Sequence, residues 1–294
     1  MPTAPMRPGW IAALCAALAV LFWGSSFAAV RLTLRHFEPG PATVLRFVTA
    51  SLVLAVYLAI RREPLPRLRD WPLITLLGFL GFTYNNLILT YGLVTVTAGS
   101  ATFLVGTMSI FSAIIGQAAF GERLRPIAWL GITVSLTGVA TIAMAEGQGS
   151  SVNLGALMMM SGIFAQSINY VFQRPLLRRY SPLQFTGWAM IIGTVGMLPW
   201  GRGVWPQLLT APPDVLLALL YLGILPTAVA HLLWSAALAR ASAYQVASAV
   251  YAMPLVGIAT GWLLLGELPP LAALVGGCTA LAGVLLVNWR GRRG

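Results

Sequence analysis

The chain has 294 residues, of which 58% are hydrophobic and 9% are charged, and its mean hydropathy is +0.83. Soluble domains carry about 25% charged residues, so this composition excludes a soluble enzyme and indicates an integral membrane protein. The net charge of +11 comes from 18 arginines without any lysine, and in a membrane protein we expect such charge in cytoplasmic loops rather than on a nucleic-acid-binding surface.

Ten apolar stretches are long enough to cross a bilayer as helices, each of which needs about 20 residues. In chain order they are 10–30, 41–60, 71–92, 98–118, 126–145, 153–173, 182–200, 214–237, 243–265 and 270–289. Most links between them are short, so neighbouring helices are expected to be antiparallel. The sequence therefore predicts an all-α integral membrane protein with ten transmembrane helices in one integrated domain, and no soluble domain.

The arginines predict the orientation of these spans. With the N-terminus inside, 14 arginines fall in inner segments, Arg46 lies within the second span, and only Arg31, Arg35 and Arg202 lie outside. Arginine collects on the cytoplasmic side of membrane proteins, so we expect both termini in the cytoplasm. This is the topology of a multi-pass protein of a bacterial-type inner membrane.

An internal repeat relates the two halves of the chain. The segments FGERLRPIAWLGITVSLTGV (120–139) and LGELPPLAALVGGCTALAGV (265–284) share the pattern G-E, eight residues, G, six residues, G-V, at an offset of 145 residues. An offset of 143 aligns the segment around Arg31 with the segment around Arg174. Five spans per half is an odd number, so the second half must enter the membrane from the opposite side. We expect two inverted five-helix repeats, 1–147 and 148–294, as in many secondary transporters; chance similarity between apolar helices is the alternative.

Several short motifs occur in an order typical of a known family. They are WGSSF (23–27) in the first span, RF (46–47) in the second, GLVTVTAGSA (92–101) between the third and fourth, and GE at 121–122 and 266–267. With these motifs the chain resembles the EamA-type branch of the drug/metabolite transporter superfamily over nearly its whole length. Within that branch it is most similar to bacterial amino-acid exporters of the YddG type. The resemblance implies ten helices, both termini inside and export of small metabolites.

One position departs from the family pattern. A proline is usual in the fourth span of such proteins, but Ser109 occupies that position here, while its repeat counterpart Pro254 is present. A kink in the fourth span is therefore in doubt.

Polar side chains at membrane depth are the best indication of a substrate site, because they are costly unless they line a cavity or pair with one another. In the sixth span Gln166, Asn169, Tyr170 and Gln173 share one helical face. They line a cavity or, as the alternative, hydrogen-bond to neighbouring helices.

The 143-residue offset carries this polar face onto the LFWGSSF stretch (21–27) of the first span. Gly24 and Ser25 lie off that face, and we expect them to pack against a neighbouring helix. Further candidates come from the third, eighth and ninth spans. The predicted cavity-lining, substrate-binding residues are Trp23, Ser26, Phe27, Tyr84, Asn86, Tyr91, Gln166, Asn169, Tyr170, His231, Trp234, Tyr244, Ser248 and Tyr251.

Two ionisable residues within spans allow more than one interpretation. His231 could relay protons, but a neutral, hydrogen-bonded histidine with a structural or substrate-contact role is favoured. Arg46 could contact an anion from the outer side, but we favour an arginine whose head extends to the membrane interface.

The acidic residues all lie at span ends or in loops, and this narrows the function. No mid-membrane carboxylate is present to bind a cation or to carry a coupling proton, and no arginine cluster is placed to hold phosphates. The sequence also lacks P-loop, GxSxG and HExxH motifs and metal-ligand spacing, so we expect no cofactor and no metal. The remaining picture is an aromatic-lined, neutral, hydrogen-bonding cavity that suits an amino acid.

We therefore expect an inner-membrane exporter of amino acids and related neutral metabolites that works by alternating access. Its partners would be the small-molecule substrate and the lipid bilayer, not nucleic acid; monomer and homodimer both stay open. One alternative is export of hydrophobic drugs, nucleobases or other small metabolites, with or without proton coupling. A membrane-embedded enzyme would need a catalytic acid or histidine cluster at one interface, which the sequence lacks.

Overall fold

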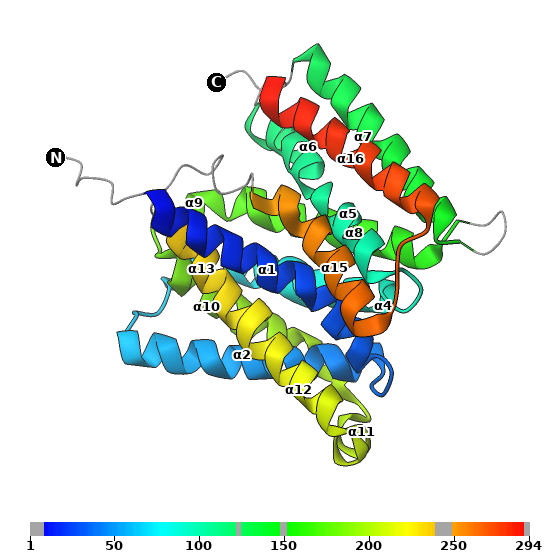
Figure 1. Cartoon of the computed structure of the whole chain (residues 1–294). Coiled ribbons are helices and arrows are strands. Elements are labelled where there is room, and N and C mark those ends of the chain that lie inside the picture. The colour runs from blue at the N-terminus through cyan, green and yellow to red at the C-terminus, as the bar shows by residue number, and fades with distance from the viewer. Residues whose placement is uncertain (1–8, 122–124, 148–151, 239–248, 291–294) are drawn as a thin grey trace.

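The computed structural model describes residues 9–121, 125–147, 152–238 and 249–290, and within these ranges all regular structure is helical. Each of the ten predicted spans contains helix (Figure 1). The first five contain α1 (Gly9–Thr33), α2 (Pro39–Arg61), η1 (Leu68–Asp70), α3 (Trp71–Gly78), η2 (Phe79–Tyr84), α4 (Asn85–Gly92), α5 (Ala98–Gly106), α6 (Met108–Phe120) and α7 (Pro126–Ala145).

The remaining helices follow the same order. They are α8 (Leu154–Phe172), α9 (Arg174–Leu177), α10 (Pro182–Met197), η3 (Leu198–Gly201), α11 (Val204–Thr210), α12 (Pro213–Leu222), η4 (Gly223–Val229), α13 (Ala230–Leu238), η5 (Ala249–Ala252), α15 (Met253–Leu265) and α16 (Leu271–Arg290). In Figure 1 the first turn of α1 lies at the left edge of the bundle, and the last turn of α16 lies near its top.

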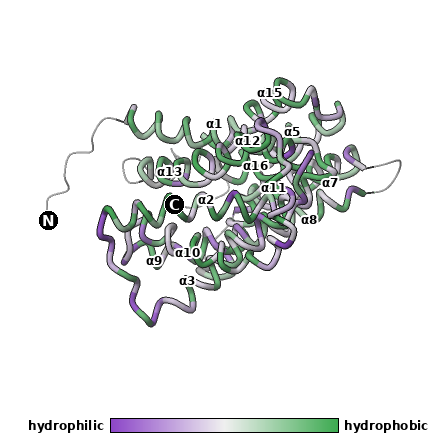
Figure 2. The backbone as a smooth tube through the Cα atoms, turned by 90° about the horizontal axis from the view of Figure 1, so that it is seen from below, coloured by the Kyte–Doolittle hydropathy of each residue, from purple (hydrophilic) through white to green (hydrophobic). Residues whose placement is uncertain are grey.

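Among the described residues, seven helical stretches are long and apolar enough to cross a membrane, and Ala249–Leu265 and Leu271–Val287 are shorter apolar helices. The stretch 182–201 is helical but is not one of these nine. Figure 2 shows hydrophobic residues along most helices and hydrophilic residues gathered in connections such as the link between α2 and α3. The protein is therefore an all-helical membrane protein.

The helix boundaries follow from local chemistry. Pro39, Pro126, Pro182 and Pro213 begin helices, where proline loses no helical hydrogen bond and its φ angle is already suitable. The side chains of Thr97, Asn153 and Ser181 accept hydrogen bonds from the first-turn amides of α5, α8 and α10, as N-caps do.

Two spans contain a π-helix near their middle. The third span changes from α to π at Phe79–Tyr84, and the eighth does so at Gly223–Val229. In the eighth span Pro226 lacks an N–H group and cannot continue the α-helical hydrogen-bond pattern. The two π segments end 145 residues apart, at Tyr84 and Val229, which is the offset found in the sequence.

Two further features recur at the same offset. The fourth span is interrupted at Thr107, so that α6 begins at Met108, and α15 begins at Met253, 145 residues later. Gly121 and Gly266 end these two helices in the left-handed conformation with φ of 68°, which glycine adopts without steric cost. The interruption before Ser109 therefore exists without a proline.

Helices α7 and α16 pack closely through glycines. A Cβ atom on Gly131 would lie 2.6 Å from the carbonyl oxygen of Gly283, and one on Gly276 would lie 2.7 Å from that of Gly138. The 145-residue offset exchanges these two contacts, as a two-fold axis between the helices requires. The glycines of the repeated pattern therefore permit the close approach of these two spans.

Two large apolar cores position the middle of the bundle. The first joins buried residues of α1, α5, α8 and α15, and the second joins residues of α2, α3, η2 and α10. The π-helices η2 and η4 lie between these helices: η2 packs against α8 and α10, while η4 packs against α2 and α13.

Candidate functional site

Five rings from four elements form a connected group, which we call the aromatic cluster: Trp23 (α1), Phe47 (α2), Phe82 (η2), His231 and Trp234 (both α13). The ring centroid of Trp23 lies 5.3 Å from that of His231 and 5.1 Å from that of Trp234. Phe82 lies 6.0 Å from His231 and 6.4 Å from Phe47. These separations are typical of attractive edge-to-face ring contacts, so the cluster ties together helices from both halves of the chain.

The π-helix η4 presents carbonyl groups to this cluster. The indole Nε1 of Trp23 donates to the carbonyl oxygen of Pro226 at 3.0 Å, and His231 Nδ1 lies 2.7 Å from the carbonyl oxygen of Thr227. A carbonyl oxygen can only accept a hydrogen bond, so Nδ1 of His231 must carry the proton that it donates. Thr227 donates to the carbonyl oxygen of Leu222 at 2.7 Å, the group that the missing N–H of Pro226 would leave unpaired.

The π-helix η2 is held by amide side chains in a similar way. Asn169 Nδ2 (α8) donates to the carbonyl oxygen of Leu77 at 2.7 Å, and Asn86 Nδ2 (α4) donates to that of Phe82 at 3.1 Å. A Cβ atom on Gly81 would lie 2.5 Å from Asn169 Nδ2, so only glycine permits this approach. Asn86 thus bonds a carbonyl group of η2 itself, and Asn169 bonds the last turn of α3 that leads into η2.

The polar face of the sixth span is buried within the bundle. Gln166 and Asn169 are buried, and Gln166 forms a side-chain hydrogen bond with Tyr170. Because Asn169 bonds the backbone of α3, the described contacts of this residue match the helix-to-helix alternative. Cavity lining by this face stays a prediction.

The remaining predicted site residues that the structure describes lie outside the aromatic cluster. Ser26 is buried and donates to the carbonyl oxygen of Trp23 in its own helix, and Phe27 belongs to the first apolar core. Tyr84 is hydrogen-bonded to Ser161 at 3.1 Å. Tyr91 is 37% exposed, and Tyr251 packs against the small core between α6, α7 and α16. Tyr244 and Ser248 lie outside the described residues.

The two small residues beside Ser26 have different surroundings. A Cβ atom on Gly24 would lie 2.7 Å from Val256 Cβ, which confirms that Gly24 is a packing contact with α15. Ser25 hydrogen-bonds the hydroxyl of Tyr221 on α12. This polar link between the first and eighth spans was not predicted from the sequence.

Arg46 points into the bundle rather than to the membrane interface. Its Nε donates to Thr227 Oγ1 in η4 at 2.7 Å, and its guanidinium lies 5.4 Å from the ring centroid of Phe47. The prediction that the side chain extends to the interface is therefore wrong, because its hydrogen-bond acceptor lies on a neighbouring helix inside the bundle.

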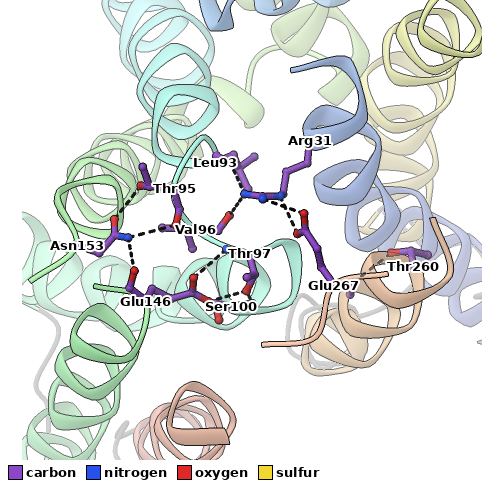
Figure 3. Close-up of polar contacts among 11 residues, drawn as sticks. Arg31, Leu93, Thr95, Val96, Thr97, Ser100, Glu146, Asn153, Thr260 and Glu267 are labelled. Carbon is purple, nitrogen blue, oxygen red and sulfur yellow. Dashed lines mark hydrogen bonds and ion pairs between the residues drawn. The ribbon is translucent and has the colours of Figure 1, made fainter. Parts of the chain in front are cut away.

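A second polar group, shown in Figure 3, closes the end of the bundle where α1, α4 and α15 finish. Arg31 donates through Nη1 to the carbonyl oxygens of Leu93 and Val96, both at 2.7 Å, and forms an ion pair with Glu267, with Nε–Oε2 at 2.8 Å and Nη2–Oε1 at 2.9 Å. The bidentate geometry is the stronger form of an arginine–carboxylate pair. Sequence analysis singled out the glycine–glutamate motif at 266–267 without predicting its partner.

The same end carries a second set of bonds across the link between α4 and α5. Thr97 Oγ1 donates to Glu146 Oε1 at 2.6 Å, and Asn153 Nδ2 donates to the Glu146 carbonyl oxygen at 2.7 Å. Thr95 Oγ1 donates to Asn153 Oδ1 at 2.9 Å. The ends of α7 and α8 are thereby fastened to the link 93–97 that Arg31 also holds.

Two cavities open at the surface of the bundle rather than at the aromatic cluster. One of about 460 Å³ lies beside the ion pair and is lined by Arg31, Arg35, His36, Glu38 and Glu267 among others. The other, of about 310 Å³, is lined mainly by apolar residues around Ser25 and Tyr221. None of the predicted site residues within the described ranges lines either cavity. In the parts of the chain that the structure describes, no group of three or more metal-binding side chains is present.

Comparison with known proteins places this geometry in context. The model of the EamA-like transporter family matches the chain twice, over residues 10–144 and 153–289. A crystal structure of another protein superposes with a TM-score of 0.63 at 20% identity and covers 94% of this chain and 95% of that one.

Three relatives illustrate the range of similar proteins. The chain is 34% identical to the "Probable terminal-alkyne amino-acid exporter" of Streptantibioticus cattleyicolor, over 94% of this chain and 93% of the relative. It is 32% identical to the transporter YdfC of Bacillus subtilis, over 91% and 87%. It is 24% identical to the "Probable amino-acid metabolite efflux pump" of Salmonella typhimurium, over 92% of each chain.

Proposed function

Because the chain belongs to the EamA-like transporter family, whose members are transporters and not enzymes, we propose that it exports amino acids and related neutral metabolites from the cell. The observation that carries this proposal is the aromatic cluster, in which neutral rings and hydrogen-bonding groups of α1, α2, η2 and α13 meet inside the bundle. Relatives named as amino-acid exporters support the substrate class. A closer likeness to YddG-type exporters, and hence a preference for aromatic amino acids, stays part of the proposal.

We further propose that transport proceeds by alternating access between two inverted halves of five spans each, 1–147 and 148–294, with both termini in the cytoplasm. The two matched ranges of the family model, the π-helices at equivalent positions and the exchanged glycine contacts of α7 and α16 support this arrangement. In such transporters the substrate binds near the midplane between the halves.

A facilitated mechanism without proton coupling fits the charges of the described residues. Their carboxylates lie in links or at helix ends, from Glu38 before α2 to Glu267 after α15, and none approaches the aromatic cluster. His231 donates from Nδ1 to a backbone carbonyl, an arrangement suited to a neutral imidazole that contacts substrate or braces η4.

The proposal is tested by counterflow of labelled amino acids in proteoliposomes, with and without a pH gradient. Exchange of amino acids without the gradient is expected. The substrate claim would fail if no amino acid exchanged while nucleobases or hydrophobic drugs, tested in the same vesicles, did. Strict dependence on the gradient would exclude the facilitator.

A further inference from the structure

Arg46 is a cation inside a membrane span whose charge the described part of the chain does not neutralise. It lies seven residues into α2, about 10 Å along the helix axis from its first residue, and extends toward η4. There α2 and η4 approach closely: a Cβ atom on Gly223 would lie 2.6 Å from Thr49 Cβ and 3.0 Å from the carbonyl oxygen of Arg46. The arginine is therefore held between two packed helices at the aromatic cluster.

The two ion pairs found among the described residues involve other arginines and lie at the bundle ends. They join Arg31 to Glu267 and Arg179 to Asp70. A guanidinium group has five N–H donors, and in the described structure Thr227 takes the one on Nε of Arg46. The two terminal nitrogens thus have donors to offer to an acceptor that the described part of the chain does not supply there.

The contacts that Arg46 does make are too weak to balance an intramembrane charge. Phe47 offers its ring face at 5.4 Å, an interaction worth about 0.5–2 kcal/mol, and Thr227 offers a neutral hydroxyl. Ionisable residues at membrane depth are costly and are usually placed for function. A carboxylate is the acceptor that matches a guanidinium in charge and in fork geometry.

We infer that Arg46 binds the carboxylate of the transported molecule, which makes the substrate a carboxylate with an apolar or aromatic part. This inference rests on the proposed transport function. The ring of Phe47 lies beside the guanidinium and leads through Phe82 to His231 and Trp23. A molecule anchored at Arg46 places its apolar part on these rings.

The experiment compares each amino acid with its carboxamide, which keeps the side chain and loses the carboxylate. Competition against counterflow of L-phenylalanine and L-leucine in proteoliposomes gives an apparent affinity for each compound. In the wild type we expect the apparent affinity for the acid to exceed that for the amide by a factor of about 30 or more. A desolvated, hydrogen-bonded charge pair contributes binding energy of this size. Arg46→Gln should lower the affinity for the acid to that for the amide and leave the amide unchanged.

Three control variants separate binding from structure. Arg202→Gln removes an exposed arginine from the link after η3 and should change neither affinity. Thr227→Val removes the Nε contact but keeps the charge, so discrimination between acid and amide should persist. Arg46→Lys keeps the positive charge but loses the two-pronged geometry of the guanidinium, so it should retain part of the discrimination between acid and amide. This variant still tests the inference if Arg46→Gln does not fold.

Equal loss of acid and amide binding in Arg46→Gln would overturn the inference and make Arg46 a brace for η4. Equal affinity of the wild type for acid and amide would also overturn it, while leaving amino-acid transport intact. Absence of amino-acid exchange in the wild type would instead remove the proposed function, and the inference with it.

Discussion

At the scale of single residues, the middle of the bundle depends on side chains that satisfy the carbonyl groups of the two π-helices. A π-helix changes the spacing of its backbone hydrogen bonds and is frequently found at functional sites. Trp23 and His231 bond carbonyl groups of η4, Asn86 bonds one of η2, and Asn169 bonds the last turn of α3 just before η2. Because an unpaired carbonyl in an apolar interior is costly, each of these side chains has a structural value that can be separated from substrate contact.

Trp23→Phe tests the bond to Pro226, because phenylalanine keeps most of the ring packing and loses the indole N–H. Loss of a buried partner costs about 1–3 kcal/mol, so we expect counterflow to fall by about tenfold or more at equal protein amounts. Trp10→Phe is the matched control, since Trp10 is 64% exposed at the start of the same helix. Equal rates in the wild type and Trp23→Phe would remove this bond from the transport site.

Ser25 and Ser26 provide a second comparison at this scale. Within the described structure Ser26 donates to the carbonyl oxygen of Trp23 in α1, whereas Ser25 bonds Tyr221 of α12. From these contacts we expect that Ser25→Ala reduces counterflow more than Ser26→Ala does, which is the opposite order to that expected from the helical face. Tyr221→Phe removes the same bond from the other side and should match Ser25→Ala, and a larger effect of Ser26→Ala would restore the sequence-based assignment.

At the scale of elements, the spans could be predicted and the interruptions within them could not. Apolar runs bounded by arginines and prolines determine where a helix crosses, so α7 begins and ends at the predicted residues 126 and 145. Hydropathy carries no information about hydrogen-bond spacing, so η2 was not predicted, although Pro226 within an apolar span was an available indication of η4. Depth along a helix likewise does not reveal the direction of a long side chain, which is why Arg46 was misassigned.

The contacts of Arg31, including its ion pair with Glu267, connect separate elements, because they hold α1 to the link 93–97 and to the segment before α16. The two side chains are 20% and 28% exposed, so solvent weakens the pair, which we take to be worth roughly 1 kcal/mol. Glu267→Gln should therefore open this end more often. Opening can be measured by the reactivity of a single cysteine introduced by Leu34→Cys, beside the ion pair, in a variant whose Cys15 and Cys278 have been replaced.

Reaction of that cysteine with a membrane-impermeant maleimide is expected to accelerate about fivefold in Glu267→Gln. Glu38→Gln is the control, because Glu38 lines the same cavity without an ion pair to Arg31. Equal acceleration in both variants would attribute the effect to the lost surface charge and not to the ion pair.

The contact between α7 and α16 gives an element-scale prediction about stability. A Cβ atom on Gly138 would lie 2.4 Å from the carbonyl oxygen of Gly276, so even Gly138→Ala forces the helices apart. Overpacking of this kind costs about 1–3 kcal/mol and should lower the thermal unfolding midpoint of the purified protein. Ala140→Val adds bulk to an exposed position of the same helix and should leave the midpoint unchanged; equal midpoints in all three proteins would contradict the close packing.

At the scale of the whole molecule, the duplication explains why features in the two halves occur in pairs. The paired π-helices and the exchanged glycine contacts illustrate this pairing, which the proposed inverted repeat would place on either side of a pseudo-two-fold axis. The two halves nevertheless differ in chemistry: the third span has Gly81 where the eighth has Pro226. We therefore expect a substrate site between the halves to be asymmetric, which suits a substrate with one charged and one apolar end.

The number of spans per half determines the last prediction. If each half has five spans, residue 147 and residue 294 lie on opposite sides of the membrane, and the arginine distribution places residue 294 inside. Alkaline phosphatase, which folds only outside the cytoplasm, should be active when fused after residue 147 and inactive after residue 294, and a fluorescent protein that matures only inside should give the opposite pattern. Activity of the same reporter at both positions would mean an even number of spans in the second half. The halves would then be parallel, and alternating access would need a different geometric basis.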